Sequence, residues 1–141
     1  MLDIRDISDY IDNIIETYNY DFKQCNAHYF NAKDTKIMCI TESKQQLYKD
    51  DYFGSPCTYK TLDTSLLIHY SKDYYETLEE ANKIYEYFDI MQYVNDNLEI
   101  GNNKVHFIKV LSRCEDIGQD ENKIFERVIR LRFFYSEKNK E

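Results

Sequence analysis

The stretch NKIFERVIRLRFFY, residues 122–135, constrains the fold more than any other part of the chain. Its side chains alternate in character: Ile129, Leu131, Phe133 and Tyr135 fall on one face, and Val128, Arg130, Arg132 and Phe134 on the other. Successive residues of a strand point to opposite faces of a sheet, so this period of two predicts a strand with one buried face. The arginines on the second face are expected to be solvated or to meet acidic groups of another chain.

Three further stretches predict strands: KIMCITES (36–43), TYKTLDTSLLIHYS (58–71) and KVHFIKVLSRCE (104–115). The second of them alternates most regularly, and it places Leu62, Thr64, Leu66, Ile68 and Tyr70 on one buried face. The segment DIGQDE (116–121) lies between the last two predicted strands. Its acidic residues and its glycine are typical of the open tip of a hairpin.

Two segments predict helices. Residues 4–18 place Ile4, Ile7, Ile11, Ile14, Ile15 and Tyr18 at helical spacing. Asp3 is expected to cap this helix, since a carboxylate there accepts hydrogen bonds from free backbone amides. The second helix is predicted to begin at Asp73, which stands three residues before Glu76 as in a capping box, and to end before Gly101.

The predicted order is helix, strand, strand, helix, strand, strand. This order indicates an α+β domain: an antiparallel sheet of about four strands with an N-terminal helix and a long central helix packed on one face. A chain of 141 residues has the length of one domain, so residues 1–135 are expected to form a single domain. Residues 136–141 are predicted to be a charged, flexible tail, and residues 19–35 a loop with room for a short strand.

Charge and composition narrow the function. The net charge is −8, so the chain as a whole does not attract phosphate groups. The sequence also has no cluster of basic residues that would neutralise phosphates, so tight binding to nucleic acid is disfavoured. Aromatic residues make up 16% of the chain, and 14 of them are tyrosines, which suit surfaces that contact another protein. An AT-rich genome is an equally good explanation for many tyrosines. The first residues form neither a signal peptide nor a membrane span, which favours the cytosol.

No motif indicates catalysis or a cofactor. His28, His69 and His106 each stand alone in the sequence and are interpreted as structural. The four cysteines, Cys25, Cys39, Cys57 and Cys114, are expected to be reduced thiols. Five acidic residues, Asp50, Asp51, Asp116, Asp120 and Glu121, lack the spacing of a calcium loop, so a solvated or interface role is preferred over metal binding. We therefore expect no enzymatic activity, no metal and no cofactor.

Three parts of the sequence together resemble the tail terminator proteins, also called minor capsid proteins, of long-tailed bacteriophages and phage-tail-like particles. These are the opening IRDISDYIDNIIETY, the strand leading directly into a helix in LLIHYSKDYYETLEEANKIYEYF, and the closing FIKVLSRCEDIGQDENKIFERVIRLRFFY. The resemblance is to the order of patterns rather than to invariant residues. Residues 19–35 and 44–57 depart from the family's pattern.

The resemblance implies a structural protein without catalytic residues, located in the virion tail and assembled in the host cytoplasm. It would form a hexameric ring on the head-proximal end of the tail tube, stop tube growth and join the head connector. Its partners would be itself, the tube protein, a sheath where the tail has one, and the connector. DNA would pass through the acidic lumen without specific binding, and no membrane would be involved.

The family has no fixed functional motif, so the resemblance implies contact regions rather than a site. Inter-subunit contacts are expected between Arg127, Arg130 or Arg132 of one copy and Asp116, Asp120 or Glu121 of its neighbour. A loop that contains Tyr48, Asp50, Asp51, Tyr52 and Phe53 is expected to contact the tube or the connector.

Three alternatives remain open. A head–tail adaptor or a tube component would also be small, acidic and ring-forming, and a tube protein would polymerise by itself. A small cytosolic enzyme that uses acidic loops and a metal ion would lose activity with a chelator. A regulatory module would bind one partner in a one-to-one complex through its tyrosine-rich face.

Overall fold

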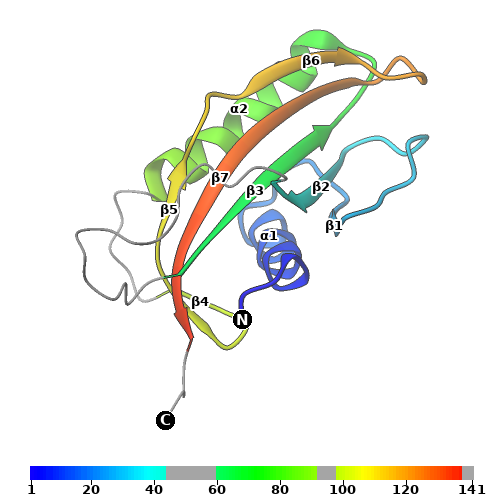
Figure 1. The fold of residues 1–141 in the computed structure, drawn as a ribbon. Coiled ribbons are helices and arrows are strands. Elements are labelled where there is room, and N and C mark those ends of the chain that lie inside the picture. The colour runs from blue at the N-terminus through cyan, green and yellow to red at the C-terminus, as the bar shows by residue number, and fades with distance from the viewer. Residues whose placement is uncertain (44–59, 92–97, 138–141) are drawn as a thin grey trace.

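The computed structural model describes residues 1–43, 60–91 and 98–137 of the chain. Two helices and seven strands lie within these residues (Figure 1). In chain order they are α1 (Ile4–Tyr18), β1 (Gln24–Ala27), β2 (Ile37–Glu42), β3 (Lys60–His69), α2 (Tyr74–Met91), β4 (Leu98–Ile100), β5 (Asn103–Val110), β6 (Glu115–Gln119) and β7 (Phe125–Glu137).

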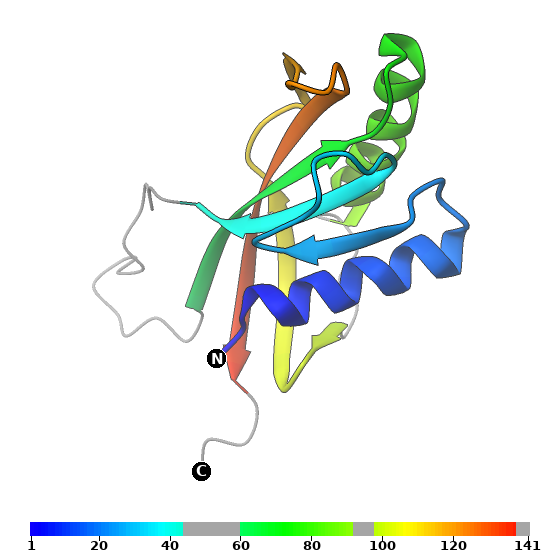
Figure 2. The same ribbon diagram turned by 90° about the vertical axis from the view of Figure 1, so that its right-hand side faces the viewer.

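The seven strands form one mixed sheet with the order β1-β2-β3-β7-β5-β4, and β6 also pairs with β7. Strand β1 runs parallel to β2, whereas every other pairing is antiparallel. The sheet curves into a half-barrel, and both helices lie on the same side of it (Figure 2). We call this side the inner face and the opposite side the outer face.

Helix α1 fills the hollow of the half-barrel. It contacts β1 and β2 at one end of the sheet and β4 at the other. Ile4, Ile7 and Ile11 are almost completely buried, because their spacing of three and four residues places them on one side of the helix. Asp3 caps the helix as predicted: its side chain accepts a hydrogen bond from the backbone N–H of Asp6, whose side chain in turn accepts one from the backbone N–H of Asp3.

Helix α2 covers the inner face of β5 and β7. Its start is defined by Asp73, which accepts a hydrogen bond from the backbone N–H of Glu76 at 3.0 Å, as predicted. Ala81, Ile84 and Phe88 are buried against the sheet. The inner faces of β3 and β7 complete the core together with Tyr70, which follows β3. Leu62 is partly buried, and the other predicted residues are buried there: Thr64, Leu66, Ile68, Tyr70, Ile129, Leu131, Phe133 and Tyr135.

Strand β7 organises the sheet. Along one side it pairs with β3 from Lys60 to His69. Along the other side it pairs first with β6 and then with β5, so two separate strands share one long partner. Because β7 has 13 residues, it is long enough to hold both. This arrangement brings residues from three distant parts of the sequence onto one surface.

The predicted four-stranded antiparallel sheet with a long central helix is wrong. The described part of the sheet has seven strands, one of its pairings is parallel, and it forms a half-barrel around α1. Helix α2 spans Tyr74–Met91 in the structure, and residues 92–97, which were predicted to continue it, lie outside the described residues. Strand β7 continues to Glu137, two residues beyond the predicted end of the domain, and residues 138–141 of the predicted tail lie outside the described residues.

The missed strands depend on contacts that the sequence pattern does not reveal. Strand β1 lies in the segment predicted to be a loop with room for a short strand, but its position and its parallel partner were not predicted, and α1 holds it there. Asp12 accepts a hydrogen bond from the backbone N–H of Cys25 at 2.6 Å, and Ser8 donates one to the carbonyl of Cys25 at 2.8 Å. Strand β6 lies where an open hairpin tip was expected. The acidic segment forms a strand there because it pairs with the first residues of β7. The three-residue strand β4 was predicted to be the end of a helix.

Candidate functional site

The outer face of the sheet carries polar pairs between β3 and β7. The register of these two strands places His69 opposite Glu126, Ser65 opposite Arg130, and Asp63 opposite Arg132. Directly opposed side chains in an antiparallel pair lie close enough to interact. Two ionic clusters result, one at each end of the paired region: His69 with Glu126 and Asp120, and Asp63 with Arg132.

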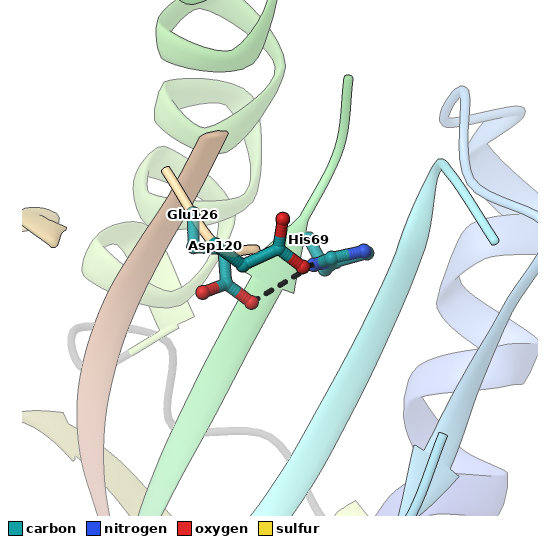
Figure 3. Close-up of side chains that lie close together, drawn as sticks. All are labelled: His69, Asp120 and Glu126. Atoms are coloured by element: carbon teal, nitrogen blue, oxygen red, sulfur yellow. Dashed lines mark hydrogen bonds and ion pairs between the residues drawn. The ribbon is translucent and has the colours of Figure 1, made fainter. Parts of the chain in front are cut away.

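His69 lies at the centre of the first cluster, which we call the His69 cluster (Figure 3). Its Nδ1 is 2.8 Å from Oε2 of Glu126 and 3.7 Å from Oδ2 of Asp120. Only 1% of the imidazole is exposed, whereas the two carboxylate side chains are 15% and 17% exposed. The cluster is therefore closed on the histidine side and open to solvent on the carboxylate side.

Asp120 is held in place by the turn between β6 and β7. Its Oδ1 accepts hydrogen bonds from the backbone N–H groups of Asn122 and Ile124 at 2.9 and 3.0 Å. Lys123 in the same turn has a φ of 64°, a left-handed conformation that is uncommon outside glycine. With Oδ1 occupied by the turn, Oδ2 is the oxygen that faces His69.

The other ring nitrogen of His69 is held by the segment between β1 and β2. Its Nε2 lies 3.0 Å from the carbonyl oxygen of Ala32, which also accepts a hydrogen bond from the side-chain amide of Asn122. Because a carbonyl oxygen only accepts, Nε2 carries a proton. Phe30 packs against the imidazole with ring centres 4.9 Å apart. Four segments thus meet at one histidine: β3, β7, the β1–β2 connection and the β6–β7 turn.

The surroundings of His69 are negative. Burial lowers the pKa of His69, but the hydrogen bond and charge of Glu126, the Ala32 carbonyl and the charge of Asp120 raise it. The net effect places the pKa of His69 above its ordinary value. The site therefore favours positive charge at Nδ1, whether a proton or a metal ion supplies it.

The geometry excludes His69 as a general base for a bulky substrate, because its ring is almost fully buried and both nitrogens face protein acceptors. The cluster does offer three atoms that ligate metal ions: Nδ1 of His69 and one carboxylate oxygen each from Asp120 and Glu126. These atoms lie within 4.8 Å of one another.

From the sequence, His69 was predicted to be an isolated structural histidine and Asp120 an interface residue. Glu126 was not singled out at all. The cluster joins residues that are 51 and 57 positions apart along the chain, so no local spacing marks it. The one signal that would have found it is the register of β3 against β7, which places His69 directly opposite Glu126.

Arg132, a predicted inter-subunit contact, lies instead in a buried ion pair within the chain. Its Nε and Nη2 donate to the two carboxylate oxygens of Asp63 at 2.6 and 2.8 Å. Both side chains are 5% exposed. Two parallel hydrogen bonds between a guanidinium and a carboxylate form the strongest geometry that this pair can adopt. The expectation of a solvated or inter-chain arginine missed this partner on the neighbouring strand.

The other two arginines differ in exposure. Arg127 is partly buried, and its Nη2 donates to the carbonyl oxygen of Cys114 at 3.0 Å, which ties β7 to the residue before β6. Arg130 is 49% exposed, and its Nη2 lies 3.6 Å from Oε2 of Glu115, which is 45% exposed. Arg130 is therefore the predicted arginine whose charge is most accessible to a neighbouring molecule.

The predicted acidic contacts also have distinct environments. Asp116 is exposed and accepts a hydrogen bond from the backbone N–H of Gly118 at 2.9 Å, where a bulge interrupts the pairing of β6 with β7. Asp120 is engaged by its turn and by His69, as described above. Glu121 is exposed in the same turn. The predicted contact loop with Tyr48, Asp50, Asp51, Tyr52 and Phe53 lies outside the described residues.

Aromatic side chains gather in two exposed places. On the outer face, Phe107 of β5 stacks on Phe134 of β7 with ring centres 4.1 Å apart. Between the last turns of α1 and α2 lies a groove of about 460 Å³, where Tyr18 packs on Tyr87 with ring centres 5.5 Å apart. The groove is lined by Tyr18, Tyr20, Lys83, Glu86, Tyr87, Ile90 and Met91. The high tyrosine content predicted a surface that contacts another protein, and three of the tyrosines line this groove.

The chain matches no known protein family and no curated protein. Among the described residues, no helix combines the length and apolar character needed to cross a membrane.

Proposed function

We propose that this protein is a structural component of a phage tail or phage-tail-like particle, a tail terminator that forms a ring on the head-proximal end of the tail tube. The proposal starts from the three sequence stretches that resemble this family. In the structure these stretches form α1, the succession of β3 and α2, and the strands β5, β6 and β7. A net charge of −8 suits a ring through which DNA passes without binding.

The observation that carries the proposal is the exposed edge of the sheet at β6. All five residues of β6 are exposed or partly exposed, and Ile117 is 50% exposed. Within the part of the chain that the structure describes, β6 pairs only with β7. Its other side presents backbone N–H and C=O groups to a further strand. A head-to-tail ring joins two different surfaces of neighbouring copies, and this exposed edge can serve as one of them.

Tail length tests the proposal directly. We expect particles assembled without the gene to carry tubes of uncontrolled, excessive length without attached heads, because nothing would stop polymerisation. Negative-stain electron microscopy of particles made with and without the gene measures this. Tails of normal length that fail to join heads would move the protein to the head-side adaptors, and unchanged particles would contradict a structural role in the tail.

The charge of Arg130 tests the ring contact. In the proposed ring, the exposed guanidinium of Arg130 meets Asp116 or Glu121 of the neighbouring copy. We expect Arg130→Glu to reduce ring formation on tubes by about tenfold or more, since reversing one charge places like charges opposite each other at a contact. The fraction of tubes that carry a terminal ring, counted in electron micrographs, gives the result.

The matched control for Arg130→Glu is Arg5→Glu, which makes the same charge change at an exposed position of α1. Both variants should keep the far-UV circular dichroism spectrum of the unmodified protein, because Arg130 is half exposed and its pairing with Glu115 is loose at 3.6 Å. Equal ring formation by the two variants would remove Arg130 from the interface.

A further inference from the structure

The donor atoms of the His69 cluster lie within 4.8 Å of one another, close to the spacing of ligands around a small metal ion. Nδ1 of His69 lies 2.8 Å from Oε2 of Glu126 and 3.7 Å from Oδ2 of Asp120. First-row divalent ions bind nitrogen and oxygen ligands at about 2.0–2.2 Å, which places neighbouring ligands about 3–3.5 Å apart. One ion between the three atoms therefore fits with small side-chain adjustments.

The second nitrogen of His69 is oriented as in a metal site. A histidine that ligates a metal commonly donates its other N–H to a backbone carbonyl or a carboxylate, which fixes the tautomer and the direction of the ring. Here Nε2 donates to the carbonyl of Ala32 at 3.0 Å. The nitrogen left to ligate is then Nδ1, the one that faces both carboxylates.

Asp120 is oriented in the same way. Its Oδ1 accepts the two backbone hydrogen bonds of the β6–β7 turn, so Oδ2 remains for a ligand. A neutral imidazole with two carboxylates carries two negative charges, which a divalent cation neutralises. The carboxylate side chains are 15% and 17% exposed, so an ion can enter from solvent, and water can complete its coordination.

We propose that His69, Asp120 and Glu126 bind one divalent transition-metal ion of the zinc type. The imidazole ligand distinguishes this site from calcium and magnesium sites, which use oxygen ligands. The ion links the end of β3 to the β6–β7 turn. It thereby stabilises the hairpin beside the exposed edge of the sheet. This inference is independent of the proposed role in a phage tail.

Zinc titration of the full chain, first dialysed against a chelator, tests the site. We expect isothermal titration calorimetry to show one equivalent of Zn²⁺, and Mg²⁺ at the same concentration not to compete. Asp120→Asn and Glu126→Gln should each weaken Zn²⁺ binding by about tenfold or more, because each replaces a charged ligand by a neutral amide. Zn²⁺ should also raise the Tm of the unmodified protein by more than it raises the Tm of either variant at the same concentration.

Both substitutions preserve shape and hydrogen bonding, so the variants are suited to comparison. Asparagine at 120 still accepts the two turn hydrogen bonds, and glutamine at 126 still offers an oxygen to a protonated His69. The matched control is Glu121→Gln, which removes a charge from the same turn at an exposed residue outside the cluster. Its Zn²⁺ affinity should equal that of the unmodified protein.

Two outcomes would overturn the proposal. The first is the absence of stoichiometric Zn²⁺ binding by the unmodified protein, which would leave His69 as a protonated link between Glu126 and Ala32. The second is undiminished binding by both cluster variants, which would place the ion elsewhere. Cobalt substitution distinguishes the ligand types, since thiolate ligation by a cysteine gives an intense near-ultraviolet charge-transfer band that a nitrogen and oxygen site lacks.

Discussion

Replacing Asp63 with alanine is expected to destabilise the fold by about 3–5 kcal/mol, because it leaves the guanidinium of Arg132 buried without its counter-ion. Both side chains are 5% exposed, so water cannot take the place of the missing carboxylate without a rearrangement. Chemical denaturation with urea at neutral pH measures the loss. Arg132→Ala should be destabilising to a similar degree, since it leaves the carboxylate of Asp63 buried without a counter-ion.

The double replacement Asp63→Leu with Arg132→Met distinguishes the contribution of the two charges to stability from the contribution of side-chain packing. Replacing both partners of a buried pair by apolar residues of similar volume is often neutral or stabilising, so the double variant should be more stable than either single variant. If the two single losses simply added in the double variant, the two charges would not be coupled and this account of the outer face would fail.

Phe133→Ala is expected to cost about 3–5 kcal/mol, because it removes a fully buried ring from the middle of β7 and leaves a cavity in the core. Phe133 pairs across the sheet with Leu62 of β3 on one side and with Ile108 of β5 on the other. The cavity would therefore weaken the packing on both sides of the central strand. Urea denaturation again gives the measurement.

The adjacent residue supplies the control. Phe134 has the same ring, but it lies on the outer face, where it is partly exposed and stacks on Phe107. Phe134→Ala should destabilise the fold clearly less. It removes the stacking contact, which contributes about 0.5–1.5 kcal/mol in addition to the free energy of burying the ring area. Similar losses for the two variants would mean that the assignment of inner and outer faces along β7 is incorrect.

The sequence predicted local structure well where one side chain pattern decides it. The spacing of Ile4, Ile7 and Ile11 predicted α1, and the alternation along residues 125–135 predicted which side of β7 is buried. In both cases the segment chooses its conformation by burying one apolar face, and that preference is encoded in consecutive residues.

The arrangement of these elements was not predictable in the same way. Strand β1 is held in place by Ser8 and Asp12 of α1, which bind the backbone of Cys25. No pattern in the sequence of either segment indicates this contact. The acidic segment at residues 116–121 was expected to be a hairpin tip because its composition is typical of turns, yet residues up to Gln119 belong to β6. It forms a strand because β7 extends far enough to pair with it. Partner strands override local preference in sheets.

The candidate site depends on register, which is why only fragments of it were predicted. Arg132 and Asp120 were singled out for their charge, but their partners Asp63 and His69 belong to a strand more than 50 residues earlier. Sequence alternation says that Arg132 lies on the outer face. It does not say which residue of β3 stands opposite. Once β3 and β7 are paired, one register produces both ionic clusters.

The central position of β7 bears on how the chain matures during translation. Strands β3 and β5 leave the ribosome before residues 125–137, yet among the described strands β7 alone joins these two into one sheet. A nascent chain that ends before β7 can pair β1 with β2, β2 with β3 and β4 with β5. These strands then form two small sheets that share no backbone hydrogen bonds, each with exposed edges. The complete sheet therefore forms only once β7 has been placed between these two small sheets.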